Sequence, residues 1–157
     1  MRRKDREITD INEILSIVKK CDVCRVALFN KEYPYIVPLN FGSSYDPDCL
    51  ELYFHCANEG LKLDLIKGNN HVAFEMDCSH RLVTGETACE YTMEFESVCG
   101  EGIIEILNTE EKRAALVLLM KQYSDAESFQ FQESVLDRVT ALKLKVQNIK
   151  GKRLVKK

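Results

Sequence analysis

Residues 92–107 restrict the fold more than any other part of this chain, because they form one strand pattern about three times the length of an average strand. The pattern is interrupted only by Gly100 and Gly102, which predict a bulge or the close approach of another backbone. A doubly wound parallel sheet needs a helix between most of its strands, and this run leaves no room for one. The sequence therefore predicts a mainly β (α+β) fold, an antiparallel barrel with peripheral helices.

The remaining elements follow from periodicity and capping signals. Thr9 or Asp10 can cap a first helix. Asp10 and Asn108 each precede a glutamate by three residues, the capping-box spacing, and each predicts a helix start. Two further helices are expected, over residues 58–67 and 132–138. Strands are expected over residues 25–29, 34–41, 50–55, 72–76 and 142–146, and loops over residues 42–48 and 79–90. Pro38 cannot donate to a strand ladder, so its strand is expected at an edge or at a bulge.

Length and charge limit the classes of function. The 157 residues suit a single domain, taken as residues 1–157. A net charge of −3 disfavours non-specific nucleic-acid binding, and no apolar run approaches the roughly 20 residues that cross a membrane. The charged first residues do not resemble a secretory signal. The seven cysteines are therefore expected to be reduced thiols in a cytoplasmic protein.

Residues 52–62 carry the clearest signal for a ligand. They run from a strand pattern through a short polar turn into a helix start, with Lys62 in or near the first helical turn. A helix start presents backbone N–H groups that have no helical acceptor, and a lysine there adds a full positive charge. These residues therefore predict a site for a phosphate or another small anion.

Three segments, taken in order, resemble a known family. They are Pro34-Tyr-Ile-Val-Pro-Leu-Asn-Phe41, Tyr53-Phe-His-Cys-Ala-Asn-Glu-Gly-Leu-Lys-Leu-Asp64 and Ser97-Val-Cys-Gly-Glu-Gly102. Together they resemble the pyridoxamine phosphate oxidase-like proteins of the flavin-binding split-barrel superfamily. The branch that they are most similar to is the nitroimidazole-resistance type. The resemblance covers nearly the whole chain.

This resemblance implies a split β-barrel that binds FMN non-covalently at the interface of a homodimer. It places the flavin ring along residues 37–40 and the phosphate at residues 55–62. It brings residues 97–98 to the flavin from the neighbouring subunit, and it matches Arg25 to an arginine that contacts phosphate or flavin. The implied cofactor contacts are Arg25, Val37, Pro38, Leu39, Asn40, His55, Cys56, Ala57, Gly60, Leu61, Lys62, Ser97 and Val98.

The implied activity is electron transfer from NADH or NADPH to a small oxidant, such as a nitro compound. Oxidation of pyridoxamine phosphate is not expected, because the phosphate turn has a single lysine and residues 149–154 do not match that branch's C-terminal signature. The alternative is a protein without enzymatic activity that binds flavin or haem. No metal centre is expected. His55 is the one weak candidate for proton transfer, and a purely structural role for it stays open.

Other residues admit both a chemical and a structural interpretation. Cys21 and Cys24 have the spacing of a redox pair or half a zinc site, but no second matching pair occurs. A three-ligand site would require Cys78, His80 and Cys89 to meet across a loop. Phe129 and Phe131 would either pack beneath a loop or cover a flavin face. The basic residues after Ile149 are interpreted as a frayed, solvated end of the chain, with a contact to phosphate or an acidic substrate as the alternative.

Overall fold

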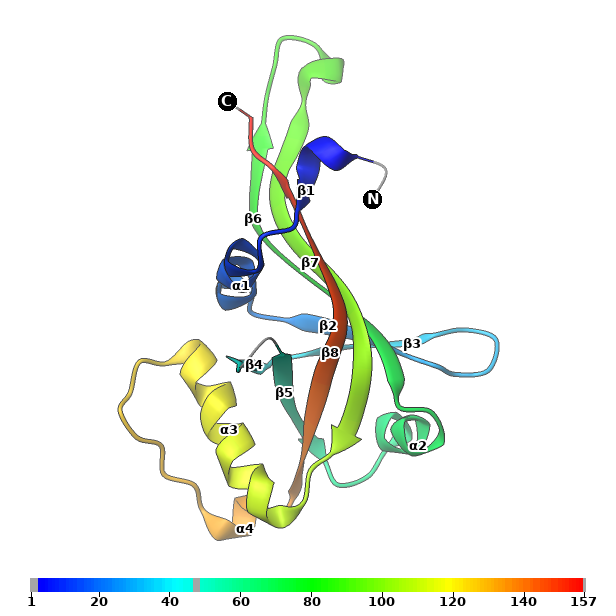
Figure 1. Cartoon of the computed structure of the whole chain (residues 1–157), viewed down its shortest axis with the longest axis vertical. Helices are drawn as coiled ribbons and strands as arrows, with labels where there is room; N and C mark the ends of the chain where they lie inside the picture. Colours follow the sequence, from blue (N-terminus) through cyan, green and yellow to red (C-terminus); the bar gives the residue numbers. More distant parts are fainter. Residues whose placement is uncertain (1–2, 47–48, 157) are drawn as a thin grey trace.

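The computed structural model describes residues 3–46 and 49–156 (Figure 1). The strands are β1 (Glu7–Ile8), β2 (Cys24–Leu28), β3 (Tyr35–Leu39), β4 (Gly42–Tyr45), β5 (Leu50–Ala57), β6 (His71–Val83), β7 (Thr92–Ile106) and β8 (Val139–Leu154). The helices are η1 (Lys4–Arg6), α1 (Ile11–Lys20), α2 (Leu61–Gly68), η2 (Ala88–Glu90), α3 (Thr109–Tyr123) and α4 (Glu133–Leu136). Among these helices, none combines the length and the apolar character that crossing a membrane would require.

The strands form one antiparallel sheet in the order β3-β2-β6-β7-β8-β5-β4, and β1 also pairs with β8. Its two edge strands, β3 and β4, are consecutive in the chain and are separated only by Asn40 and Phe41. The sheet must therefore curl until its edges approach each other, although no hydrogen-bonded ladder closes it. The predicted antiparallel split barrel is confirmed, and Pro38 lies in an edge strand as expected.

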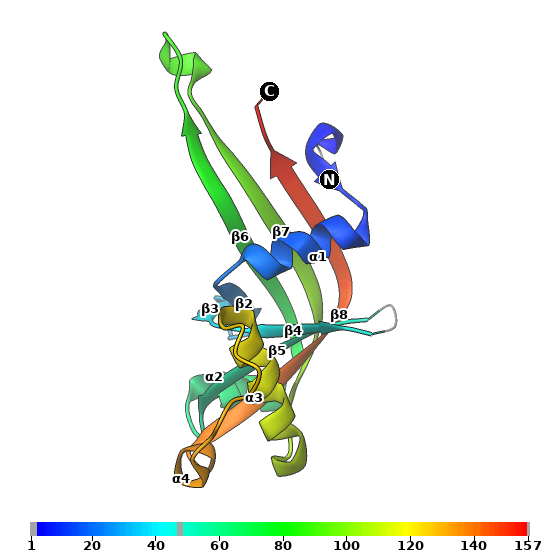
Figure 2. The same cartoon turned by 90° about the vertical axis from the view of Figure 1, so that its left-hand side faces the viewer.

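Three long strands extend beyond the barrel. Figures 1 and 2 show β6, β7 and β8 rising together from the barrel, with α1 lying across them. We call residues 77–97 and 152–154 the arm, and the rest of the sheet with α2, α3 and α4 the body. In the arm, α1 packs against β6 and β7, and β1 pairs with the end of β8. The body has helices on both sides: α2 packs near β2, and α3 packs against β4, β5 and β8.

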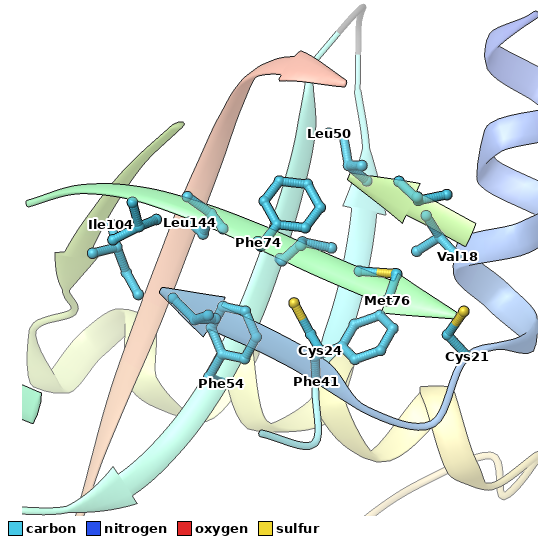
Figure 3. Packing of buried hydrophobic residues seen from close by; sticks show 14 of the residues in the cluster. Val18, Cys21, Cys24, Phe41, Leu50, Phe54, Phe74, Met76, Ile104 and Leu144 are labelled. Atoms are coloured by element: carbon cyan, nitrogen blue, oxygen red, sulfur yellow. The ribbon is translucent and has the colours of Figure 1, made fainter. Parts of the chain in front are cut away.

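The core of the body is apolar. Phe41, Phe54, Ile104 and Leu144 are at most 1% exposed, and they lie in one cluster with residues of β2 and β6 (Figure 3). Burial of each such side chain contributes about 1.5–3 kcal/mol to folding. This cluster forms because every second residue is apolar over residues 50–56 of β5, 72–78 of β6 and 142–146 of β8, so the curled sheet presents a continuous apolar face inward there.

Two local predictions from the sequence are confirmed. The side chains of Asp10 and Asn108 each accept a hydrogen bond from the backbone N–H three residues later, at 3.0 Å, and so cap α1 and α3. Such a cap contributes about 1 kcal/mol. The register between β7 and β8 shifts between Glu101 and Gly102, and a Cβ at Gly102 would overlap the Lys145 carbonyl. The bulge and the close backbone approach are therefore both present.

Three expectations about loops and ends were wrong. Residues 42–45 form β4, because they pair with β5 even though their own pattern is polar. β6 continues to Val83 across an irregularity after Cys78, because β7 supplies it with a partner strand. The C-terminal basic residues are not frayed: β8 continues to Leu154, and Arg153 bonds to Glu96 at 2.6 Å and to Glu13 at 2.7 Å. Lys157 lies outside the described residues.

Candidate functional site

The turn between β5 and α2 leaves donors without acceptors. The helix begins at Leu61, later than the expected Asn58, and its N-cap is Gly60 with φ +129°. No side chain caps this end, and the Gly60 carbonyl accepts from the N–H groups of Leu63 and Asp64. The N–H groups of Leu61 and Lys62 therefore have no acceptor within the helix. Nothing lies within 4 Å of the place where a Cβ at Gly60 would stand, so the space in front of these donors is open.

Lys62 is the second residue of α2 and is half-buried. Within the part of the chain that the structure describes, its ammonium has no hydrogen-bond or ion-pair partner. The Cys56 thiol lies near it: burial raises the pKa of Cys56, and the charge of Lys62 partly lowers it. A positive charge without a partner thus stands beside the open N–H groups, in the place where the sequence predicts an anion.

A side chain that the sequence analysis did not single out holds this turn in place. Asn58 donates to the Asp137 carbonyl at 2.7 Å and accepts from the Thr140 hydroxyl at 2.9 Å. It thereby joins the turn to the start of β8, where Ala57 pairs with Val139. Arg138 is therefore brought beside the turn, and among the described residues its side chain has no ion-pair partner. Because this proximity depends on the pairing of two distant strands, nothing in the local sequence could have predicted it.

The candidate His55 lies on the other side of β5. It is exposed and pairs with Ala141 of β8, whereas Phe54 and Cys56 on either side of it face the core cluster. Along a strand, neighbouring side chains point to opposite faces. His55 and Cys56 therefore cannot line the same surface, although both belong to the predicted phosphate segment.

The predicted flavin-ring segment, residues 37–40, lies at the edge of the sheet. Val37 and Leu39 are half-buried against the core, and Pro38 is exposed on the opposite side. The Asn40 side chain is already engaged: its amide donates to the Asp22 carbonyl at 3.0 Å and to the Tyr123 hydroxyl at 3.4 Å. The amide of Asn40 therefore fixes the corner between β3 and β4.

Arg25 lies on the convex side of the sheet, between two carboxylates. It bonds to Glu75 at 3.1 Å and also to Asp77, and the hydrogen bond to Asp77 raises the pKa of its guanidinium. Ser97 is half-buried on the same side and pairs with Asp77, whereas Val98 is fully buried in the core. The predicted cofactor contacts therefore do not share one surface. Some lie at the β5–α2 turn, Arg25, Pro38 and Ser97 lie on the convex side of the sheet, and Val37, Leu39 and Val98 face the core.

We call this convex surface the outer face. Its residues are Ile36, Pro38, Arg25, Ala27, Ala73, Glu75, Cys99, Glu101, Asn148 and Lys150, which are neighbours in the strand register. Most of them are exposed, including Ile36 at 60%. The outer face has two shallow depressions. One of about 270 Å³ lies over Ala27 and Ala73, and another of about 370 Å³ lies beside Cys99. α1 and α2 bury their apolar residues in the core instead.

The cysteines show no metal-binding arrangement. Cys21 and Cys24 are fully buried, and burial raises the pKa of both thiols. Cys78 and His80 stand at the base of the arm, whereas Cys89 lies in η2, which follows β6. Across residues 3–46 and 49–156, no group of three or more histidines, cysteines or carboxylates is arranged to hold a metal ion.

Comparisons with known proteins place this fold in a family. A family model described as pyridoxamine 5'-phosphate oxidase matches residues 10–153. A candidate 5-nitroimidazole antibiotic resistance protein from Bacteroides thetaiotaomicron is 34% identical, with a TM-score of 0.80 over 94% of this chain and 86% of the other. A comparison with curated proteins yields no match.

Two further solved structures share the fold at lower identity. The flavocytochrome Anf3 from Azotobacter vinelandii has a TM-score of 0.83 at 16% identity, over 99% of this chain and 72% of the other. An FAD- and haem-binding protein from Mycobacterium smegmatis has a TM-score of 0.82 at 20% identity, over 94% of this chain and 73% of the other. The matched family model and the 34% identical structure both extend over most of the chain. The chain therefore belongs to the pyridoxamine 5'-phosphate oxidase family.

Proposed function

We propose that this chain binds FMN non-covalently as a homodimer and transfers electrons from NADH or NADPH to a small oxidant such as a nitro compound. The observation that carries this proposal is the uncapped start of α2, where Lys62 has no partner among the described residues. Family membership supports it, and so does the name of the 34% identical relative, which refers to nitroimidazole resistance.

The β5–α2 turn fits a phosphate group. The N–H groups of Leu61 and Lys62, with the ammonium of Lys62, offer donors on an open side of the turn. A charge-assisted hydrogen bond of this kind contributes about 1.5–3 kcal/mol. The tie from Asn58 to β8 holds the donors in position, so little ordering is needed when an anion binds.

The ring would lie along residues 37–40, with Arg25 and Ser97 as further contacts. An edge strand has backbone groups without a strand partner, and Pro38 lowers the number of its donors. The flavin supplies the redox chemistry when it is bound, so the chain needs no acid–base pair. In this proposal the protein positions the ring, keeps water away from it and holds the negative charge of the phosphate.

The outer face is the surface that we propose for the second copy. It carries a mixture of charges, such as Arg25, Glu75 and Lys150, around the apolar strip of Ile36, Ala27 and Ala73. An isologous dimer needs a surface that complements itself, and a patch with both signs of charge can meet that need. A stable interface would bury about 1,200–2,000 Å² in total.

The experiment that tests the phosphate assignment is an FMN titration of Lys62→Ala. Loss of one charge-assisted contact should weaken FMN binding about tenfold to a hundredfold. Lys67→Ala is the matched control, because Lys67 lies in the last turn of the same helix and its removal should leave FMN affinity unchanged. Equal affinity in wild type and Lys62→Ala would contradict the assignment.

A second measurement separates an oxidoreductase from a protein that only binds flavin or haem. The haem alternative is kept because two proteins of the same fold are described as a flavocytochrome and as an FAD- and haem-binding protein. The FMN-loaded protein is mixed with NADPH or NADH without oxygen, and the flavin absorbance is followed. A fall in the flavin absorbance with NADH or NADPH, followed by its return when a nitroaromatic compound is added, supports the oxidoreductase. A flavin that stays oxidised with both donors contradicts it.

A further inference from the structure

The hydroxyl group of Tyr123 connects three parts of the chain at the corner between β3 and β4. It accepts a hydrogen bond from the backbone N–H of Phe41 at 2.9 Å and one from the Asn40 amide at 3.4 Å. It donates to the backbone carbonyl of Asp22 at 2.7 Å. Tyr123 is the last residue of α3, so the end of this helix is bound to the corner and to the segment between α1 and β2.

The neighbouring residue, Gln122, makes a different set of contacts. Its side-chain amide donates to the carbonyls of Val18, Lys19 and Cys21 at 3.1–3.2 Å. These carbonyls belong to the C-terminal end of α1, where backbone acceptors would otherwise lack partners. Gln122 therefore joins α3 to α1 without a hydrogen bond to β3 or β4, whereas Tyr123 bonds directly to the corner.

The corner needs such a support. β3 is an edge strand and pairs only with β2, and within it Pro38 has no N–H to donate. After Leu39, only Asn40 and Phe41 connect it to the opposite edge of the sheet. Phe41 is fully buried, so its side chain anchors the corner from within, while its N–H depends on the Tyr123 hydroxyl.

We propose that Tyr123 is a positioning residue for the flavin ring, acting through residues 37–40. This inference rests on the proposed function, in which that segment lies along the ring. The hydroxyl sets the end of β3, and the end of β3 sets where its backbone groups meet the ring. Without the hydroxyl, the buried Phe41 N–H loses its acceptor, and the corner moves to find another one.

The test compares Tyr123→Phe with Gln122→Ala in the full chain. Tyr123→Phe keeps the ring of the side chain and should bind FMN about threefold to tenfold more weakly, with a shifted visible absorption and circular dichroism spectrum of the bound flavin. Gln122→Ala removes contacts from the same helix end, so it should lower the urea midpoint while leaving flavin affinity and spectrum as in wild type.

The outcomes separate this inference from the proposed function. Wild-type affinity and an unshifted flavin spectrum in Tyr123→Phe overturn the inference alone. Equal effects of both variants on the flavin also overturn it, because they would reflect a general loosening of α3. A wild-type protein that takes up no FMN overturns the proposed function, and the inference with it.

Discussion

The same three long strands run through both the body and the arm, but different kinds of side chain fill the space beneath them in the two regions. In the body, the side chains at the centre of the sheet are apolar and fully buried, as with Phe54 and Leu144. In the arm, Glu94 and Glu96 of β7 take the corresponding inward positions and are also buried. Glu96 accepts hydrogen bonds from Lys20, Ser79 and Arg153 at 2.6–2.9 Å.

The difference follows from what covers each region. The sheet of the body curls, and apolar residues from several strands meet inside it, so water is excluded from its centre. Near the arm, the helix α1 packs on β6 and β7, and the two residues of β1 only extend the sheet beside the end of β8. Lys20 of α1 is 50% exposed, so long charged side chains reach the arm from the solvent and form its centre. A sheet can thus change from apolar to ionic packing along a single strand.

The largest expected effect is on the body. Phe54→Ala should lower the free energy of unfolding by about 3–5 kcal/mol, because it leaves a cavity in a tightly packed core. Leu82→Ala in the arm is the control, since Leu82 is 56% exposed and should cost less than about 0.5 kcal/mol. Urea denaturation measures both. A loss below about 1 kcal/mol for Phe54→Ala would show that the apolar core contributes less to the free energy of unfolding than its packing indicates.

A smaller effect is expected from the arm. Glu96→Gln should cost about 2–3 kcal/mol, because Lys20 and Arg153 lose the carboxylate that they share. The loss should shrink in 1 M salt, whereas that of Phe54→Ala should not. Glu127→Gln, at an exposed position in the loop after α3, serves as the control and should change little. If Glu96→Gln lowered the free energy of unfolding by the same amount at low and high salt, ionic packing in the arm would be contradicted.

The same carboxylate makes the arm sensitive to acid. Burial by itself raises the pKa of Glu96, but hydrogen bonds from Lys20, Ser79 and Arg153 outweigh it and hold the pKa at about 2, against an ordinary 4.5. A lowered pKa in the folded state gives stability that is present above about pH 4.5 and is lost as the pH falls towards 2. The stability difference between wild type and Glu96→Gln should therefore narrow over this interval, as measured by urea midpoints at several pH values.

The smallest effect is expected from the ion pair between Arg81 and Glu94, in which the arginine side chain is exposed. Arg81 bonds to Glu94 at 2.6 Å, and this hydrogen bond lowers the pKa of Glu94. Because the Arg81 side chain is 67% exposed, Arg81→Ala should lower the free energy of unfolding much less than Glu96→Gln does. Thermal denaturation can measure this difference beside Glu96→Gln. A cost equal to that of Glu96→Gln would mean that exposure does not weaken ion pairs in the arm.

The sequence predicted the body better than the arm. Strands with apolar alternation, such as the run through Val72, Phe74 and Met76, carry their own signal of which side is buried. The helix caps at Asp10 and Asn108 were also local signals, and both are present. In the arm, Glu96 and Arg153 are 57 residues apart, and each looks like an ordinary surface charge until the strands pair.

The candidate site likewise combines features that the local sequence predicts with features that depend on distant contacts. The strand, turn and helix start around Lys62 could be predicted because they are contiguous in sequence. β4 could not, because Gly42 to Tyr45 become a strand only through pairing with β5, and α3 packs so closely that a Cβ at Gly42 would overlap the backbone of Leu118. Arg138 and Tyr123 reach their places through contacts with residues about 80 positions away, which no local pattern encodes.

The pairing of β1 with β8 has a consequence for how the protein is made. Ile8 pairs with Gly151 and Glu7 with Lys152, so β1 has no partner strand until the end of β8 has also left the ribosome. At about 5–20 residues per second, that delay lasts roughly 7–30 s. During translation the β6–β7 hairpin can form earlier, while the residues before α1 stay accessible to chaperones and proteases until the end of β8 has been synthesised.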